Sequence, residues 1–148
     1  MAGCRARVFG IDARRAGPQD TLMRFQPVEW HEQLESTNAY LRELVRSGRA
    51  EAGAVVAART QTTGRGRAGR IWTSVPDQDL TFSFVCSPAA PAIQIPALAM
   101  AVALTAAETL VELGVPARVK WPNDLRAGGR KIGGILTERV VAAAAAVE

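Results

Sequence analysis

The segment 95–113 constrains the fold more than any other part of the sequence, because it is apolar on nearly every side. It is rich in residues that favour helices, and Gly114, with Pro116 just beyond it, marks a helix end. We therefore expect a long, mostly buried helix over this segment. A helix of this kind needs a second layer of structure to cover it.

The other periodic segments predict that layer. Ser36 or Thr37 is a suitable N-cap, and an apolar stripe that ends before Gly48 predicts a helix over 37–47. β-prone runs predict strands over 54–58, 81–86 and 117–121, and a hairpin that pairs 125–126 with 131–140 across residues 127–130. This order of elements predicts an α+β fold, in which a mixed β-sheet is flanked by helices.

The two ends of the chain carry little pattern. Residues 1–27 show no sustained periodicity, and we expect a flexible leader there, with the folded domain in 28–148. The alanine run 142–146 is of low complexity, and it favours a frayed helix or an irregular end.

Composition excludes several classes of protein. With 148 residues, of which 48% are hydrophobic, the chain can bury the core of one domain. Its apolar runs are too short for a membrane helix, and no secretory signal is recognisable, so we expect a cytoplasmic protein without a membrane partner. Cys4 and Cys86 lie far apart and fit reduced thiols, and with a single histidine they make a zinc site improbable.

The basic residues are divided unevenly. Sixteen of the 18 are arginine, and both lysines, Lys120 and Lys131, fall in one segment. That clustering indicates positions that require a compact ammonium group. The net charge of +4 also leaves a nucleic-acid-binding module as an alternative.

The loop TGRGRAGRIW, residues 63–72, is the first candidate site. Its Gly-x-Gly-x-x-Gly spacing does not open a helix, no acid follows about 20 residues on, and Gly-Lys-Ser/Thr is lacking, so dinucleotide and Walker sites are excluded. Glycines let backbone N–H groups converge on an anion, and Arg65, Arg67 and Arg70 can surround it. A solvated loop and an RNA-contacting Arg-Gly segment remain alternatives, and Trp72 could stack on a base or plug the core.

The segment KWPNDLRAGGRKIGGILTE, residues 120–138, is the second. Lys120 and Asn123 bracket a proline turn at a strand end, where polar side chains can share a cleft. Lys131 begins a strand whose Gly133 and Gly134 would let a flat ligand lie against the backbone. The alternative is a glycine-rich hairpin with incidental lysines.

Three pieces of the chain together resemble the biotin protein ligase family. They are Ser36-Thr37-Asn38, then Gln61 with the loop 64–72, and then Lys120-Trp121-Pro122-Asn123-Asp124-Leu125 with Lys131-Ile132-Gly133-Gly134-Ile135-Leu136. The resemblance covers residues 28–138, and the lysine-containing segment distinguishes it from lipoate ligases, which share the general fold.

The resemblance implies a catalytic domain like that of class II aminoacyl-tRNA synthetases. Such a domain joins biotin to ATP as biotinyl-5'-AMP, with Mg²⁺, and transfers biotin to a lysine of a biotin carboxyl carrier protein. Fixed cations lower the barrier when a carboxylate attacks a phosphate. A glycine-hinged loop can then shield the mixed anhydride from water.

The resemblance also implies the roles of single residues. Arg67 and Lys131 are expected to be catalytic. Biotin is expected to contact Ser36, Thr37, Asn38, Gln61, Arg65, Gly66, Arg67 and Lys131. ATP and the adenylate are expected to contact Arg67, Arg70, Trp72, Lys120 and Asn123. No metal ligand is assigned, because Asp124, the nearest acid, fits a backbone-bonding turn residue better.

The sequence departs from the family pattern at its ends. Family members continue through further strands to a small C-terminal β-barrel, whereas this chain ends ten residues after Glu138. We therefore expect the N-terminal portion of a catalytic domain, with an exposed sheet edge, no DNA-binding domain, and a homodimer left open. The alternative function is a non-catalytic fragment that binds biotin.

Overall fold

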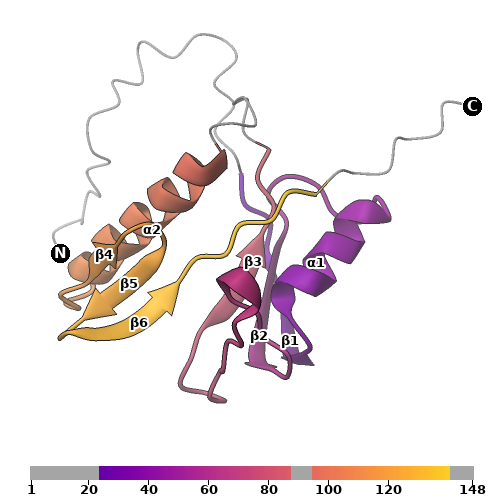
Figure 1. The fold of residues 1–148 in the computed structure, drawn as a ribbon. Helices are drawn as coiled ribbons and strands as arrows, with labels where there is room; N and C mark the ends of the chain where they lie inside the picture. The colour runs from indigo at the N-terminus through magenta and orange to yellow at the C-terminus, as the bar shows by residue number, and fades with distance from the viewer. Residues whose placement is uncertain (1–23, 88–94, 141–148) are drawn as a thin grey trace, which may run out of the picture.

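The computed structural model describes residues 24–87 and 95–140. Within these ranges the chain forms two helices and two three-stranded sheets (Figure 1). The expected α+β fold is confirmed, but its strands form two sheets instead of the single one predicted. Most of the predicted leader, and the alanine run 142–146, lie outside the described residues.

The first sheet consists of β1 (Val28–Leu34), β2 (Val55–Gln61) and β3 (Thr81–Phe84), in that order. β1 and β2 are parallel and are joined through helix α1 (Thr37–Arg46), while β3 runs antiparallel to β2. The sheet is therefore mixed in direction, as the sequence predicted.

Helix α1 covers one face of the first sheet. Leu41 and Leu44 are three residues apart and therefore lie on the same side of the helix, and both pack against Val56 of β2, which is 1% exposed. The helix begins where Ser36, in extended conformation, accepts a hydrogen bond from the backbone of Ala39. This packing fixes the start of α1 above the end of β2.

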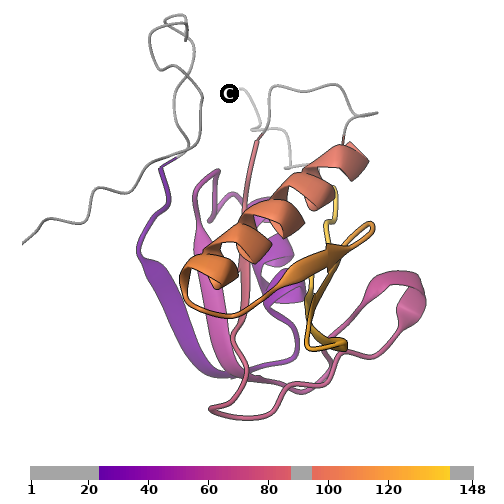
Figure 2. The same ribbon diagram turned by 90° about the vertical axis from the view of Figure 1, so that its left-hand side faces the viewer.

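The second sheet consists of β4 (Arg118–Lys120), β5 (Asp124–Ala127) and β6 (Arg130–Gly134), all antiparallel. Helix α2 (Ile95–Glu112) packs on it through Ala107, which contacts the core with Ala117 and Leu125. α1 and α2 lie on opposite sides of the first sheet (Figures 1 and 2).

The hairpin between β5 and β6 turns through two glycines. Gly128 and Gly129 have φ angles of 54° and 77°, in the left-handed region that a two-residue turn of this kind requires. β6, the second strand of the hairpin, ends at Gly134, whereas the sequence predicted that it would continue to residue 140. Beyond it, residues 135–140 run back towards α1, where Arg42 and Glu138 form an ion pair of 3.3 Å (Figure 1).

Helix α2 is less buried than predicted. Ala103 and Ala107 are buried, but Met100, Leu104 and Val111 are 42%, 55% and 54% exposed. The expectation of a mostly buried helix is therefore wrong for the described chain, because only one side of α2 meets the second sheet. Neither described helix has the length and hydropathy that a bilayer crossing requires.

Candidate functional site

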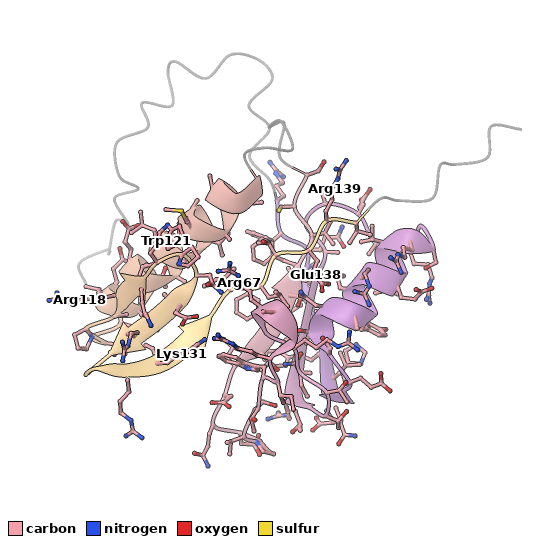
Figure 3. The ribbon with its side chains drawn as sticks, in the orientation of Figure 1. Arg67, Arg118, Trp121, Lys131, Glu138 and Arg139 are labelled. Carbon is pink, nitrogen blue, oxygen red and sulfur yellow. The ribbon has the colours of Figure 1, made fainter. Side chains whose placement is uncertain are left out.

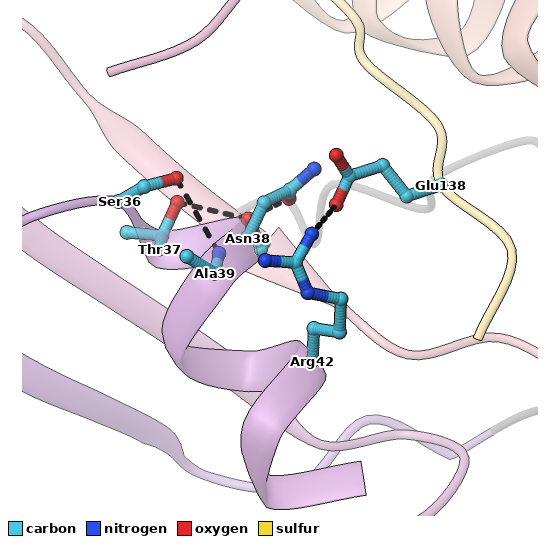
Figure 4. A network of polar contacts seen from close by, with 7 residues as sticks. Ser36, Thr37, Asn38, Ala39, Arg42 and Glu138 are labelled. Atoms are coloured by element: carbon cyan, nitrogen blue, oxygen red, sulfur yellow. Dashed lines mark hydrogen bonds and ion pairs between the residues drawn. The ribbon is translucent and has the colours of Figure 1, made fainter. Parts of the chain in front are cut away.

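A buried polar network lies where α1 starts. Thr37 lies at the centre of this network. Its backbone N–H and its hydroxyl donate to Oε1 of Gln61, at 2.8 and 3.1 Å. The Thr37 and Ser83 hydroxyls also lie 2.8 Å apart, and the Ser83 hydroxyl contacts the side-chain amide of Asn38 as well. Residues from α1, the end of β2 and the middle of β3 thus meet at one point. Figure 4 shows the part of this network around Ser36, Thr37 and Asn38 at the start of α1.

This network holds its amide groups in fixed orientations. Ser36, Thr37 and Ser83 are all less than 9% exposed, so their hydroxyls need partners, and they find them in each other and in the helix backbone. Because Oε1 of Gln61 accepts from Thr37, its NH₂ group is the free end of that amide. The arrangement can bind a neutral polar group that needs both donors and acceptors.

The glycine loop is closed by its own backbone. The N–H of Trp72 donates to the carbonyl of Gly64 at 2.9 Å, and the N–H of Gly66 donates to Arg70 at 2.7 Å. These two N–H groups are therefore occupied by the loop itself and do not point to an anion. The expected convergence of backbone donors does not include them.

Gly64 allows this closure. A Cβ atom at Gly64 would lie 2.5 Å from the carbonyl oxygen of Trp72, far inside contact distance. The tip of the loop is a 3₁₀ turn over Arg67–Gly69, in which Ala68 takes a φ of 54°. A non-glycine residue with positive φ is a strained position of the kind found at functional loops.

The tip of the loop contacts the second sheet. Arg67 donates from Nη1 to Oδ1 of Asn123 at 2.8 Å. The Nζ of Lys131 lies 5.3 Å from the ring centroid of Trp72 and forms an ion pair of 2.7 Å with Asp124. These contacts bring Arg67 and Trp72 of the loop together with Asn123 and Lys131 of the second sheet. Figure 3 labels Arg67 and Lys131, which lie between the two sheets.

Asn123 is itself held from behind. The side-chain NH₂ of Asn123 donates to the backbone carbonyl of Ile135 at 2.8 Å. The backbone N–H of Ile135 donates to the backbone carbonyl of Asn123 at 2.9 Å. The segment after β6 thus fixes the acceptor that receives Arg67. The Trp121–Pro122 bond beside this turn is cis.

Three predicted site residues are not brought into these contacts. The side chains of Arg65, Arg70 and Lys120 are exposed, and within the described ranges none of them makes a hydrogen bond or ion pair. The loop turns Arg65 and Arg70 towards solvent. Lys120 lies beside Asp124 in the sheet, as its paired residue across β4 and β5.

The sequence analysis missed two hydroxyls and misassigned one acid. Ser83 sits inside the polar network, and Ser74 accepts a hydrogen bond of 2.9 Å from the N–H of Gln61. The alternation Thr81-Phe82-Ser83-Phe84 was a signal for Ser83, because it puts both hydroxyls on one face of the strand. Asp124 pairs with Lys131 instead of bonding to a turn backbone.

The described residues offer no ready-made metal site. Between 24 and 87 and between 95 and 140, no group of three or more His, Cys, Asp or Glu side chains is placed to hold a metal ion. Asp124 is the carboxylate beside Lys131, and that lysine occupies it.

Comparison with known proteins gives a consistent result. A sequence model described as the Biotin/lipoate A/B protein ligase family matches residues 30–147. The chain is 35% identical over 114 residues to "Bifunctional ligase/repressor BirA" of Bacillus subtilis, covering 76% of this chain and 35% of that protein. It is also 35% identical over 115 residues to "Biotin–[acetyl-CoA-carboxylase] ligase" of Mycobacterium tuberculosis, covering 72% of this chain and 42% of that one.

Solved structures agree with these relatives. The biotin protein ligase of Aquifex aeolicus in complex with biotin and ATP superposes with a TM-score of 0.69 at 32% identity, over 78% of this chain and 48% of that chain. The chain therefore spans about a third to a half of the proteins that it matches.

Proposed function

Because the chain belongs to the biotin/lipoate A/B protein ligase family, we propose that its site activates biotin with ATP and transfers it to a lysine of a carrier protein. In the first step a carboxylate oxygen of biotin bonds to the α-phosphorus of ATP, and pyrophosphate leaves with the electron pair. In the second, the lysine amine attacks the acyl carbon of biotinyl-5'-AMP, and AMP leaves.

The observation that carries this proposal is the meeting of two cations and an indole at one turn. Arg67 and Lys131 contact the neighbouring residues Asn123 and Asp124, and Trp72 lies beside the ammonium. Two anions must approach in the first step, and preorganised cations can contribute about 3–4 kcal/mol each to such a transition state. Lys131 is assigned to the biotin carboxylate and the α-phosphate, and Arg67 to the phosphate oxygens.

The polar network supports the binding of biotin. The ureido ring of biotin has one carbonyl acceptor and two N–H donors, which suit the amides and hydroxyls around Thr37. We assign Ser36, Thr37, Asn38 and Gln61 to this ring, with Ser83 holding Thr37 and Asn38 in place.

The glycine loop is proposed to cover the adenylate. Arg65 and Gly66 lead directly into the tip that carries Arg67, and ordering of the loop over the product would exclude water from the mixed anhydride. Arg70, Trp72, Lys120 and Asn123 are assigned to the nucleotide. Arg65, Arg70 and Lys120 would have to turn towards it, since they are exposed in the unliganded chain.

Magnesium is proposed to enter with the ATP phosphates. Mg²⁺ commonly keeps several waters and uses one or two carboxylates beside substrate phosphates. The described residues do not form a cage for it, and none of the steps assigned above passes through it. We propose a biotin carboxyl carrier protein as acceptor, in the cytoplasm, and leave a homodimer as an expectation.

The test compares two variants in adenylate formation. We expect Lys131→Ala to slow formation of biotinyl-5'-AMP about 100-fold, because it removes a cation at the reacting phosphate. We expect Arg67→Ala to shorten the lifetime of the adenylate, because the loop loses its contact with Asn123. Pyrophosphate release and a chase with unlabelled biotin measure the two effects.

Arg130→Ala is the matched control, since Arg130 is exposed in the same hairpin and outside the site. Equal adenylate yield and lifetime in all four proteins would remove the assigned roles. A folded wild-type chain that gives no heat with biotin, with or without ATP, would remove the whole proposal.

A second candidate is a fragment that binds biotin without catalysis. The polar network around Thr37 favours it, because none of the hydrogen bonds described for that network involves Arg67 or Lys131. Biotin binding without any release of pyrophosphate would support this candidate over the ligase.

A further inference from the structure

A basic pocket lies at the outer edge of the second sheet, beside the β5–β6 turn. It encloses about 310 Å³ and is lined by Arg118, Lys120, Arg126, Gly128 and Gly129, among others. Arg118 and Arg126 have no role in the function proposed above. The pocket brings three cations together in a small space.

The strand register explains why these cations share one face. Arg118 is paired with Arg126 across β4 and β5, and Lys120 is paired with Asp124. Directly paired residues of antiparallel strands project from the same face, and so do residues two apart on one strand. The opposite face, with Val119 and Leu125, packs against α2.

The three cations lack acidic partners. Of the carboxylates in the described part of the chain, none lies within ion-pair distance of Arg118, Lys120 or Arg126. Like charges this close repel each other unless an anion joins them. The pocket is therefore suited to a multiply charged anion.

Arg126 is held in place for such a role. One of its terminal nitrogens donates to the carbonyl of Gly129, and its Nε is buried without a hydrogen-bond partner. A guanidinium group has five N–H donors, so most of its capacity is unused. The turn that needs two glycines thus also positions a cation.

The pocket adjoins the candidate site. Lys131 of the site is paired with Arg126 across β5 and β6, and Arg126 is paired with Arg118 across β4 and β5. A row of cations therefore crosses the three strands from Lys131 through Arg126 to Arg118, with Lys120 two residues from Arg118 on β4.

We propose that this pocket is a diphosphate subsite, which binds the pyrophosphate end of ATP and holds it as it leaves. The inference rests on the proposed function for its ligand. When the bond between the α-phosphorus and the bridging oxygen breaks, that oxygen keeps the electron pair, and the charge on the leaving pyrophosphate increases. Arg118 and Arg126 meet that charge.

Inorganic pyrophosphate is the probe. We expect the double variant Arg118→Gln/Arg126→Gln to weaken pyrophosphate binding at least tenfold by calorimetry, without biotin present. Orthophosphate should bind more weakly to the wild-type chain, since it cannot span the row of cations. Arg130→Gln/Arg139→Gln removes the same charge from exposed positions outside the pocket, and it should change the affinity less than twofold.

Arg118→Gln alone repeats the test if the double variant loses its fold, because Arg118 is exposed on an edge strand. Pyrophosphate affinity that is unchanged in the pocket variants, or lowered equally in the control, overturns the subsite. Binding of a single-stranded oligonucleotide through these arginines, with none of pyrophosphate, also overturns it. A wild-type chain that binds pyrophosphate through the pocket but does not bind biotin overturns the proposed function alone.

Discussion

Thr37 is the residue on which the polar network depends. It joins Gln61 and Ser83 through one hydroxyl, and it is 4% exposed. A buried hydroxyl with two partners is costly to remove, because both partners lose a hydrogen bond in a place that water cannot reach.

We predict that Thr37→Val lowers the free energy of unfolding by about 1–3 kcal/mol, because it strands the buried groups of Gln61 and Ser83. Under the proposed function it also weakens biotin binding at least tenfold. Urea unfolding and calorimetry measure the two effects. Thr109→Val is the control, since the Thr109 hydroxyl bonds to its own helix at an exposed position. Equal losses in both variants would contradict the prediction.

Gly64 and Gly66 make different demands on the loop. A Cβ atom added at Gly64 would lie 2.5 Å from the carbonyl oxygen of Trp72. A Cβ atom added at Gly66 would have its nearest neighbours at 3.5 and 3.6 Å, which is an ordinary contact distance. The two positions therefore separate a steric requirement from a merely flexible loop.

We predict that Gly64→Ala opens the loop and costs about 1–3 kcal/mol of stability, as overpacking does elsewhere. Trypsin should then cleave at Arg65, Arg67 or Arg70 several times faster than in the wild-type chain. Gly66→Ala should be cleaved at the wild-type rate, because its φ of −109° suits alanine. Identical digestion of both variants would mean that the loop is open already.

At the scale of elements, the sequence predicted helices better than strands. α1 and α2 carry cap signals and apolar periodicity, and both were found within one residue of their observed ends. β1 was missed because Val28–Leu34 is an edge strand, whose residues are mostly exposed and whose apolar alternation is interrupted by Glu32. Its backbone hydrogen bonds to β2 form it, and they leave no mark on the side chains.

The residues of the site also differ in how far the sequence could predict them. Arg67, Asn123 and Lys131 could be predicted to share one turn, because each belongs to a specific motif at the end of an element. For Ser83 the strand alternation indicated only which face its hydroxyl shares with Thr81, and its partners depend on the packing of α1 over β3. Ser74 could not be singled out without the structure, since nothing in the loop sequence indicates that its hydroxyl accepts from the backbone of Gln61.

β1 and α1 are also joined by a hydrogen bond of 2.8 Å from the Tyr40 hydroxyl to Glu29. This bond is the main cause that lowers the pKa of Glu29, and His31 assists it. A carboxyl whose pKa is lowered by folding contributes stability above its ordinary pKa, and that contribution is lost as the pH falls through the folded value.

We predict that Tyr40→Phe raises the pKa of Glu29 towards its ordinary value of 4.5. The variant should be less stable than the wild-type chain at pH 7, and the difference should disappear in acid. NMR titration of the Glu29 carboxyl and unfolding at both pH values measure this. In a Glu29→Gln background the substitution should have no pH-dependent effect.

At the scale of the molecule, large apolar side chains are exposed both on α2 and on the first sheet. Leu104 and Val111 are more than half exposed on α2, and Trp30 and Phe82 are 60% and 52% exposed on the strands. Exposed apolar surface of this extent promotes association.

We predict that Leu104→Lys/Val111→Lys reduces self-association of the chain at high concentration, measured by analytical ultracentrifugation. Thr105→Lys/Thr109→Lys adds the same charge to exposed positions of α2 that carry no apolar side chain, and it should have a smaller effect. If the two pairs act equally, net charge and not the apolar stripe controls association.

The hydrogen bond between Arg67 and Asn123 has a consequence for how ligands enter. The guanidinium of Arg67 is already oriented by the neutral amide of Asn123 before a phosphate binds. Binding of the phosphate therefore exchanges one hydrogen-bond acceptor for another and does not need to order a mobile side chain. A phosphate adds an attraction between opposite charges that a neutral amide lacks. Replacement of Asn123 by a phosphate is therefore favourable, and until then Asn123 keeps the guanidinium of Arg67 oriented.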